Sequence, residues 1–307
     1  MKLRKYQPGD EAGILELFTE TYGIKRSLAW WQWYYQANPA GKAIIWVAEA
    51  DNKIIGHRAL VPYRFWDGQT YSIACQATDA ATDQNYRGQG IFTQLTKAVI
   101  KEAESKGWKF IFSFPNEQSL PGNQKLGWEP VKKLRKWVKP LLCFSKGGYN
   151  KSKEQNYLQT VLTVGEEFTL FWHKYGIAAA GIHKDGTYLK WRYQDKPGEK
   201  YDLLAVIKNN ELQAFVVVRR EANRGHLLEF MPGSLDPGNL LKKVEAYLCS
   251  CGIKFVTMWP PQDLPMHPLL LGYLPNPLRV GTLAIRPLSG KEVNTNWRVT
   301  PGDPDYA

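Results

Sequence analysis

The sequence predicts an α/β protein of the α+β kind, with two similar domains that each contain a mixed, mostly antiparallel sheet flanked by helices. Three alternating apolar segments between residues 42 and 83 are typical of consecutive antiparallel strands. A glycine-containing loop and an amphipathic helix follow them directly. The same order of elements begins again after residue 158, which indicates an internal repeat.

Length and composition agree with this prediction. The chain has 307 residues, of which 44% are hydrophobic and 22% charged, close to the averages for globular proteins. This length allows two domains, each with its own core. No apolar run is long enough to predict a transmembrane helix, and the charged start of the chain lacks the apolar stretch of a secretory signal.

The net charge of +11 predicts an anionic partner such as a coenzyme phosphate, an anionic lipid or an acidic sugar. The densest basic run, residues 132–139, alternates apolar and charged side chains and predicts a strand or an interdomain connector. No nucleic-acid-binding motif accompanies the charge, so we do not expect nucleic acid as a partner.

The four cysteines show neither metal-ligand spacing nor nearby histidines, so no metal site is predicted. Cys249 and Cys251 lie in an apolar segment and are interpreted as small core residues. A reducing, cytoplasmic setting fits this pattern best.

The first elements follow from short patterns. Asp10 is placed to cap a helix that runs to about Thr19. The aromatic cluster Trp30–Tyr35 either packs in a core, which we favour, or lines an acceptor groove. Strands are predicted over residues 42–50, 53–65 and 71–82, with turns at Asp51-Asn52 and Asp67-Gly68.

The loop Asn85-Tyr86-Arg87-Gly88-Gln89-Gly90-Ile91-Phe92 joins the third strand to a helix over residues 91–105. Two glycines allow a tight turn and a close approach of the backbone to a ligand. The helix start adds unpaired N–H groups and the positive end of its dipole. The junction therefore suits an anion such as a pyrophosphate, with Arg87 beside it. A buried strand, residues 109–114, and a last strand after Gln124 complete the unit.

This order resembles the GNAT superfamily of acyl-CoA-dependent N-acetyltransferases, over about residues 1–140. The resemblance rests on the Arg87–Ile91 loop and on Lys125-Leu126-Gly127-Trp128. It implies acetyl-CoA as the acyl donor and a pyrophosphate bound at the loop. It also places Asn116 near the pantetheine arm. The implied cofactor-binding residues are Ala81, Thr82, Arg87, Gly88, Gln89, Gly90, Ile91, Phe92 and Asn116.

Two positions depart from the family pattern. Asn85 replaces the first residue of the pyrophosphate motif, which is a mild change. Asn123 stands where many members have a tyrosine that acts as general acid. A thiolate leaving group has a pKa of about 8.5, so water or a weak donor could replace that tyrosine.

The family chemistry is attack of a neutral amine on a thioester. Backbone N–H groups along residues 79–82 are the expected oxyanion donors, since the fourth strand of this fold diverges from the fifth. Asp79, Asp83 and Glu117 are candidate bases, although for each we favour a structural role as a solvated or hydrogen-bonded acid. His57 is a further candidate and could equally be packed beside the second strand. The candidate catalytic residues are Asp79, Glu117 and Asn123.

The second half repeats the pattern with one loss. Residues 191–197, which begin Trp-Arg-Tyr-Gln, resemble residues 33–39, and strands, an Asn-containing turn and a helix over 239–250 follow. The place of the glycine loop is taken by residues 230–234, which lack the Arg-Gly-x-Gly pattern. We expect a GNAT domain over 1–145, a degenerate GNAT-like domain over 146–290, and a tail over 291–307 that forms a strap or a disordered end.

The function predicted is acetyl-CoA-dependent N-acetyltransfer to an amine of a small molecule, with an amino sugar or a cell-envelope or polysaccharide precursor as the expected acceptor. The preference for such acceptors rests on analogy with two-domain members of the superfamily. One alternative is a Fem-like aminoacyl transferase, which would use aminoacyl-tRNA. Another is a protein that binds acyl-CoA or a glycan without chemistry. The sequence does not indicate an oligomeric state.

Overall fold

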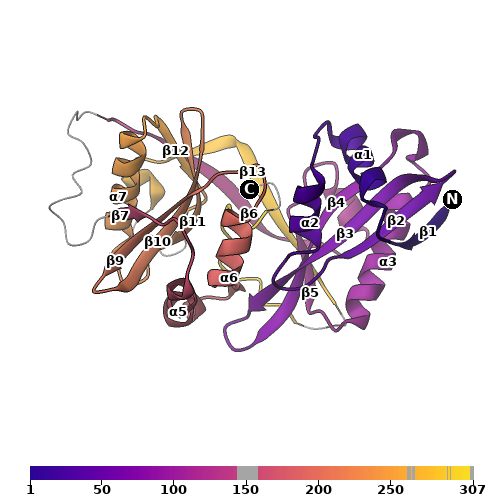
Figure 1. Ribbon diagram of the computed structural model, residues 1–307, viewed down its shortest axis with the longest axis horizontal. Helices are drawn as coiled ribbons and strands as arrows, with labels where there is room; N and C mark the ends of the chain where they lie inside the picture. Colours follow the sequence, from indigo (N-terminus) through magenta and orange to yellow (C-terminus); the bar gives the residue numbers. More distant parts are fainter. Residues whose placement is uncertain (144–157, 261–263, 265–266, 289, 291, 305–307) are drawn as a thin grey trace. The chain divides into compact units, whose positions relative to one another are not determined.

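The computed structural model describes residues 1–143, 158–260, 264, 267–288, 290 and 292–304. Its chain divides into two compact units (Figure 1). Unit 1 contains residues 1–132, 195–198 and 282–295, and unit 2 contains residues 133–194, 199–281 and 296–307. The predicted domain boundary after residue 145 and the last three residues of the predicted tail lie outside the described residues.

Unit 1 is a mixed sheet with helices. Its strands have the order β1-β2-β3-β4-β5, followed by the end of β13. All neighbours are antiparallel except β4 and β5, which are parallel. The elements are β1 (Lys2–Lys5), α1 (Glu11–Tyr22), α2 (Leu28–Tyr35), β2 (Ile44–Ala50), β3 (Lys53–Trp66), β4 (Tyr71–Thr82), α3 (Ile91–Ser105), β5 (Phe110–Ser113) and α4 (Leu120–Gln124).

The aromatic cluster of α2 packs in the core of unit 1. Trp31, Trp33, Tyr34 and Tyr35 are all buried, and Ser27 caps the helix by accepting from the N–H of Trp30. Core packing, the favoured interpretation, is therefore confirmed for these four rings. The side-chain cap predicted at Asp10 is not observed. Its side chain accepts from Arg4 and from the N–H of Gln7, and it makes no cap hydrogen bond to α1.

Unit 2 repeats this arrangement with the strand order β6-β12-β11-β10-β9-β7, in which only β11 and β12 are parallel. Its elements are β6 (Glu129–Pro140), β7 (Leu158–Thr160), α5 (Glu166–Tyr175), β8 (Gly181–Ile182), α6 (Gly186–Leu189), a π-helical turn (Lys190–Gln194), β9 (Asp202–Lys208), β10 (Glu211–Glu221), β11 (Arg224–Met231), α7 (Pro237–Ser250), β12 (Phe255–Met258) and β13 (Leu274–Pro287).

The hairpin turns show the repeat at the level of the backbone. Asp51 and Asn52, between β2 and β3, have φ of 50° and 58°. Asn209 and Asn210, between β9 and β10, have φ of 51° and 60°. Asp and Asn tolerate this left-handed conformation, which two-residue hairpins require. The predicted fold class and the duplicated order of elements are confirmed.

The last strand of each sheet comes from the other half of the sequence. β6 follows β5 in the chain but pairs with β12, with Met258 opposite Trp137. β13 follows β12 but pairs with β5, with Ala284 opposite Ser113. Because of this exchange, neither half of the chain can complete its own sheet.

The described residues near the C-terminus, 296–304, are packed rather than disordered. Trp297 is completely buried, and Thr300 and Asp303 are buried as well. The N–H of Arg298 donates to the carbonyl of Ala180 in the same unit. Trp297, Thr300 and Asp303 are therefore part of the core of unit 2.

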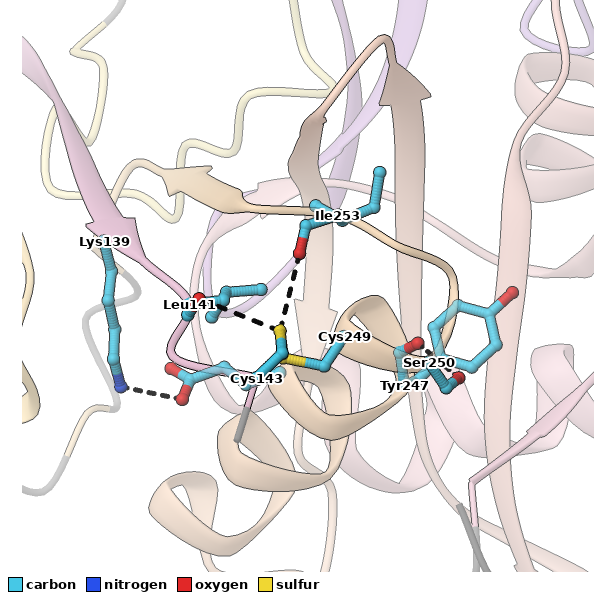
Figure 2. Close-up of a disulfide and its surroundings, with 8 residues drawn as sticks. Lys139, Leu141, Cys143, Tyr247, Cys249, Ser250 and Ile253 are labelled. Atoms are coloured by element: carbon cyan, nitrogen blue, oxygen red, sulfur yellow. Dashed lines mark hydrogen bonds and ion pairs between the residues drawn. A yellow bond between two sulfur atoms is a disulfide. The ribbon is translucent and has the colours of Figure 1, made fainter. Parts of the chain in front are cut away.

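A disulfide joins Cys143 to Cys249 and ties the chain that follows β6 to α7 (Figure 2). The interpretation of Cys249 as a small, reduced core residue is therefore wrong. The pairing could not be inferred from spacing because 106 residues separate the two cysteines. Cys75 and Cys251 are free. The cytoplasmic setting stays a prediction, since a disulfide is more typical of an oxidising compartment.

Candidate active site

The loop between β4 and α3 has the geometry of an open anion site. Gly88 and Gly90 have φ of 79° and 75°, in the left-handed region that favours glycine. Gly90 is the N-cap of α3, and no side chain caps the helix start. The first N–H groups of α3 therefore have no partner within the helix. Residues 87–90 are exposed, so a ligand can reach these groups.

The predicted cofactor residues lie in three places. Ala81 and Thr82 close β4, and Arg87 to Phe92 form the loop and the first turn of α3. Ile91 is buried, so it can offer only its backbone N–H to a ligand. Asn116 is exposed in the loop after β5, where its side-chain oxygen accepts from the N–H groups of Gln118 and Ser119. That contact organises the entry to α4.

β4 diverges from β5 next to the loop. Their pairing ends at Gln76 opposite Phe112, while β4 continues to Thr82. On the other side, β4 bulges against β3 between two pairs, Thr78 with Ala59 and Ala81 with His57. Asp79 lies in the bulge with φ of 47°, one of the few non-glycine residues in the left-handed region. Residues 77–82 therefore continue β4 beyond its pairing with β5, as expected for a site that binds an acyl thioester.

The carboxylate of Asp79 is fully engaged. Arg26 Nη1 lies 2.6 Å from Oδ1, while the hydroxyls of Tyr35 and Thr78 donate to Oδ2. The Asp79 side chain is only 4% exposed. Burial, and then the charge of Asp79, raise the pKa of Tyr35 well above its ordinary value, so this hydroxyl stays a donor. A carboxylate with three donors is poorly placed to take a proton from a substrate.

His57, on β3, contacts the same bulge. Its Nδ1 lies 2.8 Å from the carbonyl oxygen of Asp79, which can only accept, so Nδ1 carries the proton. Its Nε2 is buried and has no hydrogen-bond partner among the residues that the structure describes. Burial lowers the pKa of His57 to about 4, so the imidazole is neutral at pH 7.

Of the other two candidate bases, Asp83 is held by contacts within the protein and Glu117 is exposed to solvent. Asp83 accepts from the N–H of Asn85 at 2.9 Å and pairs with Lys53 at 3.1 Å. These contacts lower its pKa, the hydrogen bond from Asn85 more than Lys53. Glu117 is exposed in the loop after β5. The structure therefore brings Asp79 and His57 together and places Glu117 in a separate loop.

Asn123 lies in α4, is buried, and its Oδ1 has no partner among the described residues. The adjacent Gly122 faces the ring of Phe92 so closely that an added Cβ would lie 3.2 Å from it. α4 therefore packs beside the first turn of α3. An amide can donate a hydrogen bond to a thiolate through Nδ2 but cannot protonate it.

Sequence reasoning missed Arg26 and Tyr35. The signal that could have found them is the repeat, because Arg26 and Tyr35 have the same spacing as Lys184 and Tyr193. In unit 2, Lys184 and the Tyr193 hydroxyl hold Glu229 of β11, at 2.8 and 2.6 Å. Each unit therefore contains a cation, a tyrosine and an acid in one network.

Unit 2 lacks the open helix start. Asp236 caps α7 by accepting from the N–H of Asn239 at 2.8 Å, and Pro237, which has no N–H, begins the helix. In the preceding loop, an added Cβ on Gly233 would lie 2.2 Å from the carbonyl oxygen of Gln213. The place that corresponds to the anion site of unit 1 is therefore capped and crowded.

Two features are absent from the part of the chain that the structure describes. No helix is long and apolar enough to cross a membrane. No group of three or more His, Cys, Asp or Glu side chains is arranged to hold a metal ion.

Comparisons with known proteins agree with this geometry. A family model of the acetyltransferase (GNAT) domain matches residues 2–131. A search of curated proteins finds no match. Many solved structures are similar in fold, among them the following three. A conserved protein of unknown function from Enterococcus faecalis V583 has a TM-score of 0.72 at 8% identity, and covers 94% of this chain and 72% of its own.

GCN5-related N-acetyltransferases from Anabaena variabilis and Kribbella flavida have TM-scores of 0.70 and 0.68, both at 14% identity. Each alignment covers 93% of this chain, and 72% and 71% of the respective relative. At such identities these structures show a common fold. The matched family model supports a GNAT domain over residues 2–131, and the solved structures show the fold of the chain.

Proposed function

We propose that the protein is an acetyl-CoA-dependent N-acetyltransferase whose donor site lies wholly in unit 1. The observation that carries this proposal is the open start of α3, with left-handed Gly88 and Gly90 at the end of a diverging β4. In unit 2 the corresponding helix start is closed by Asp236 and Pro237. One chain would therefore bind one acetyl-CoA.

The donor would be held mainly by main-chain groups. The diphosphate would accept from the N–H groups of residues 88–91, with the exposed Arg87 guanidinium beside it. The pantetheine arm would lie along the part of β4 that extends beyond its pairing with β5. Asn116 and Asn123 would line the opposite side of the arm. The N–H groups of residues 79–82 would stabilise the developing oxyanion, since donors fixed before the reaction need no reorganisation.

The acceptor would be a neutral amine of a small molecule. Holding amine and thioester in contact can contribute about 7–11 kcal/mol to catalysis. The leaving thiolate needs only a weak donor, so Asn123 Nδ2 or water would be sufficient. Amino sugars and cell-envelope precursors are the first acceptors to screen, followed by other small amines.

The donor site can be tested by thermal unfolding with acetyl-CoA. A ligand at 100 times its dissociation constant stabilises the folded state by about 2.7 kcal/mol. Gly90→Asp should abolish the shift, because the new carboxylate repels the diphosphate and competes for the same N–H groups. Asp tolerates the left-handed conformation, so the variant should fold.

Gly107→Asp is the matched control. Gly107 follows the other end of α3, has φ of 70°, and has no atom within 4 Å of an added Cβ. This variant should keep the acetyl-CoA shift. A shift that survives in Gly90→Asp would overturn the proposal. A shift with aminoacyl-tRNA but none with acetyl-CoA would favour the Fem-like alternative, and binding without release of free thiol across an amine panel would favour a binding protein.

A further inference from the structure

The two units allow features needed by the fold to be separated from features needed by function. Unit 2 has the fold but a closed anion site, so whatever both units share is explained by the fold. The network of cation, tyrosine and acid is shared, as Arg26, Tyr35 and Asp79 in unit 1 and Lys184, Tyr193 and Glu229 in unit 2. This network is therefore explained without catalysis.

His57 is not shared. It is the fifth residue after the Asp51-Asn52 turn, and the fifth residue after the corresponding Asn209-Asn210 turn is Phe215. The two rings pack alike. His57 lies edge-on to Phe18 of α1 with centroids 4.8 Å apart, and Phe215 lies edge-on to Phe168 of α5 at 5.3 Å. A phenyl ring thus fills this place in unit 2 without any polar atom.

The imidazole in unit 1 carries a cost that a phenyl ring avoids. His57 is only 1% exposed, and its Nε2 has no hydrogen-bond partner among the described residues. An unsatisfied buried polar group costs about 1–3 kcal/mol. Packing alone would therefore favour Phe, as in unit 2. What the imidazole adds is the donor at Nδ1, 2.8 Å from the carbonyl of Asp79.

That carbonyl belongs to the one residue of β4 with a left-handed backbone, at φ of 47°. β11 of unit 2 also bulges, between Glu229 and Leu227, but neither these residues nor Leu228 between them has a positive φ. The open anion loop, the left-handed bulge and the buried histidine therefore occur together in unit 1. In unit 2 all three are replaced.

We propose that His57 is a positioning residue for acyl transfer. Its Nδ1–H holds the Asp79 carbonyl, and this fixes the bulge that sets the direction of the N–H groups of residues 80–82. His57 acts through the main chain and does not touch the substrate. The inference builds on the proposed acetyl transfer, but the part that concerns the bulge can be measured without any cofactor.

Three variants distinguish the contribution of Nδ1 from that of Nε2. His57→Phe installs the residue of unit 2 and removes both nitrogens. His57→Asn places an amide close to the position of Nδ1, whereas His57→Gln places one close to that of Nε2. We expect the bulge to be more mobile in His57→Phe and His57→Gln than in the wild type. In His57→Asn it should stay as rigid as in the wild type.

The first measurement is amide hydrogen exchange of residues 79–82 without acetyl-CoA. Exchange should be at least tenfold faster in His57→Phe and His57→Gln than in the wild type, and close to wild type in His57→Asn. Equal exchange in all four proteins would overturn the inference. This readout does not depend on the acetyltransferase activity, so it remains decisive if the proposed function fails.

The second measurement is acetyl transfer with a substrate found in the amine screen. His57→Phe should lower kcat about 100-fold, since misplacing a catalytic group by about 1 Å has that effect. Its dissociation constant for acetyl-CoA should stay within about twofold, and its Tm at pH 7 should not fall. His57→Asn should recover most of kcat. Rescue by Gln and not by Asn would overturn the inference, because the essential nitrogen would then be Nε2.

Discussion

Units 1 and 2 have the same order of elements but differ at the start of one helix, which is α3 in unit 1 and α7 in unit 2. In unit 1, α3 begins at left-handed Gly90 with its N–H groups open. In unit 2, α7 begins behind the side chain of Asp236 and the ring of Pro237. The difference teaches that this fold does not itself leave a helix start open to a ligand. The site requires a loop that leaves the main chain uncapped, which is a cost to stability at that position.

The shared network differs in a second, instructive way. In unit 1, Arg26 is 18% exposed and also packs on Trp30, with its guanidinium carbon 4.0 Å from the ring centroid. In unit 2, Lys184 is 4% exposed and is enclosed by Glu229, Thr300 and Asp303. The C-terminal segment thus completes the network of unit 2 as a buried cluster. Burial raises the pKa of Glu229 above its ordinary value, although Lys184 opposes this.

The largest effect expected from this contrast is on stability. Lys184→Met should destabilise the protein by about 3–5 kcal/mol, because it leaves two buried acids without their cation. Arg26→Met should cost about 2 kcal/mol, since Tyr35 and Thr78 still donate to Asp79. Urea unfolding of both variants checks the order. A smaller loss for Lys184→Met than for Arg26→Met would contradict the buried cluster.

A second difference is the disulfide, which belongs to unit 2 alone. Cys143→Ser should lower the free energy of unfolding of that unit by about 2–4 kcal/mol, because the bond closes a loop of 106 residues. Cys251→Ser, which alters a free cysteine, is the matched control and should have little effect. Thiol titration of the denatured, unreduced protein should find two free thiols. Four free thiols would show that the bond is absent.

A third and smaller effect concerns acid stability. The unfolded state takes up a proton at His57 near pH 6.5, whereas the folded state does so only near pH 4. Stability should therefore be lost as pH falls from 6.5 towards 4, by about 2 kcal/mol at pH 5. The groups that face this ring are Asp79, Arg26, Arg58 and Tyr35.

His57→Phe should remove this part of the pH dependence. The difference in unfolding free energy between wild type and variant, measured at pH 7 and at pH 5, isolates the contribution of His57. His226, whose pKa is also lowered to about 4, is present in both proteins and cancels. An equal fall in stability for both proteins would mean that His57 is protonated in the folded state near its ordinary pKa.

Local physics explains what the sequence could predict. The helix expected over residues 91–105 is observed over Ile91–Ser105, because a glycine start, an apolar stripe and a glycine stop all lie within it or beside it. The strands and hairpin turns of both units follow in the same way. The loop at Arg87–Gly90 could likewise be predicted from its two glycines together with the strand before it and the helix after it.

Contacts between distant segments explain what the sequence could not predict. The exchange of β6 and β13 leaves no local trace, since each strand would look the same in either sheet. The Cys143–Cys249 bond and the contacts of Arg26 and Tyr35 with Asp79 join residues 106, 53 and 44 positions apart. Only the comparison of the two halves of the sequence indicates a role for Arg26 and Tyr35.

The most direct test of the central claim is isothermal titration of the intact protein with acetyl-CoA, combined with hydrogen exchange of the complex. We expect one site per chain, with amides 88–91 protected on binding and the amides at the start of α7, residues 238–240, unchanged. Two sites per chain, or protection at α7 instead of α3, would contradict the account.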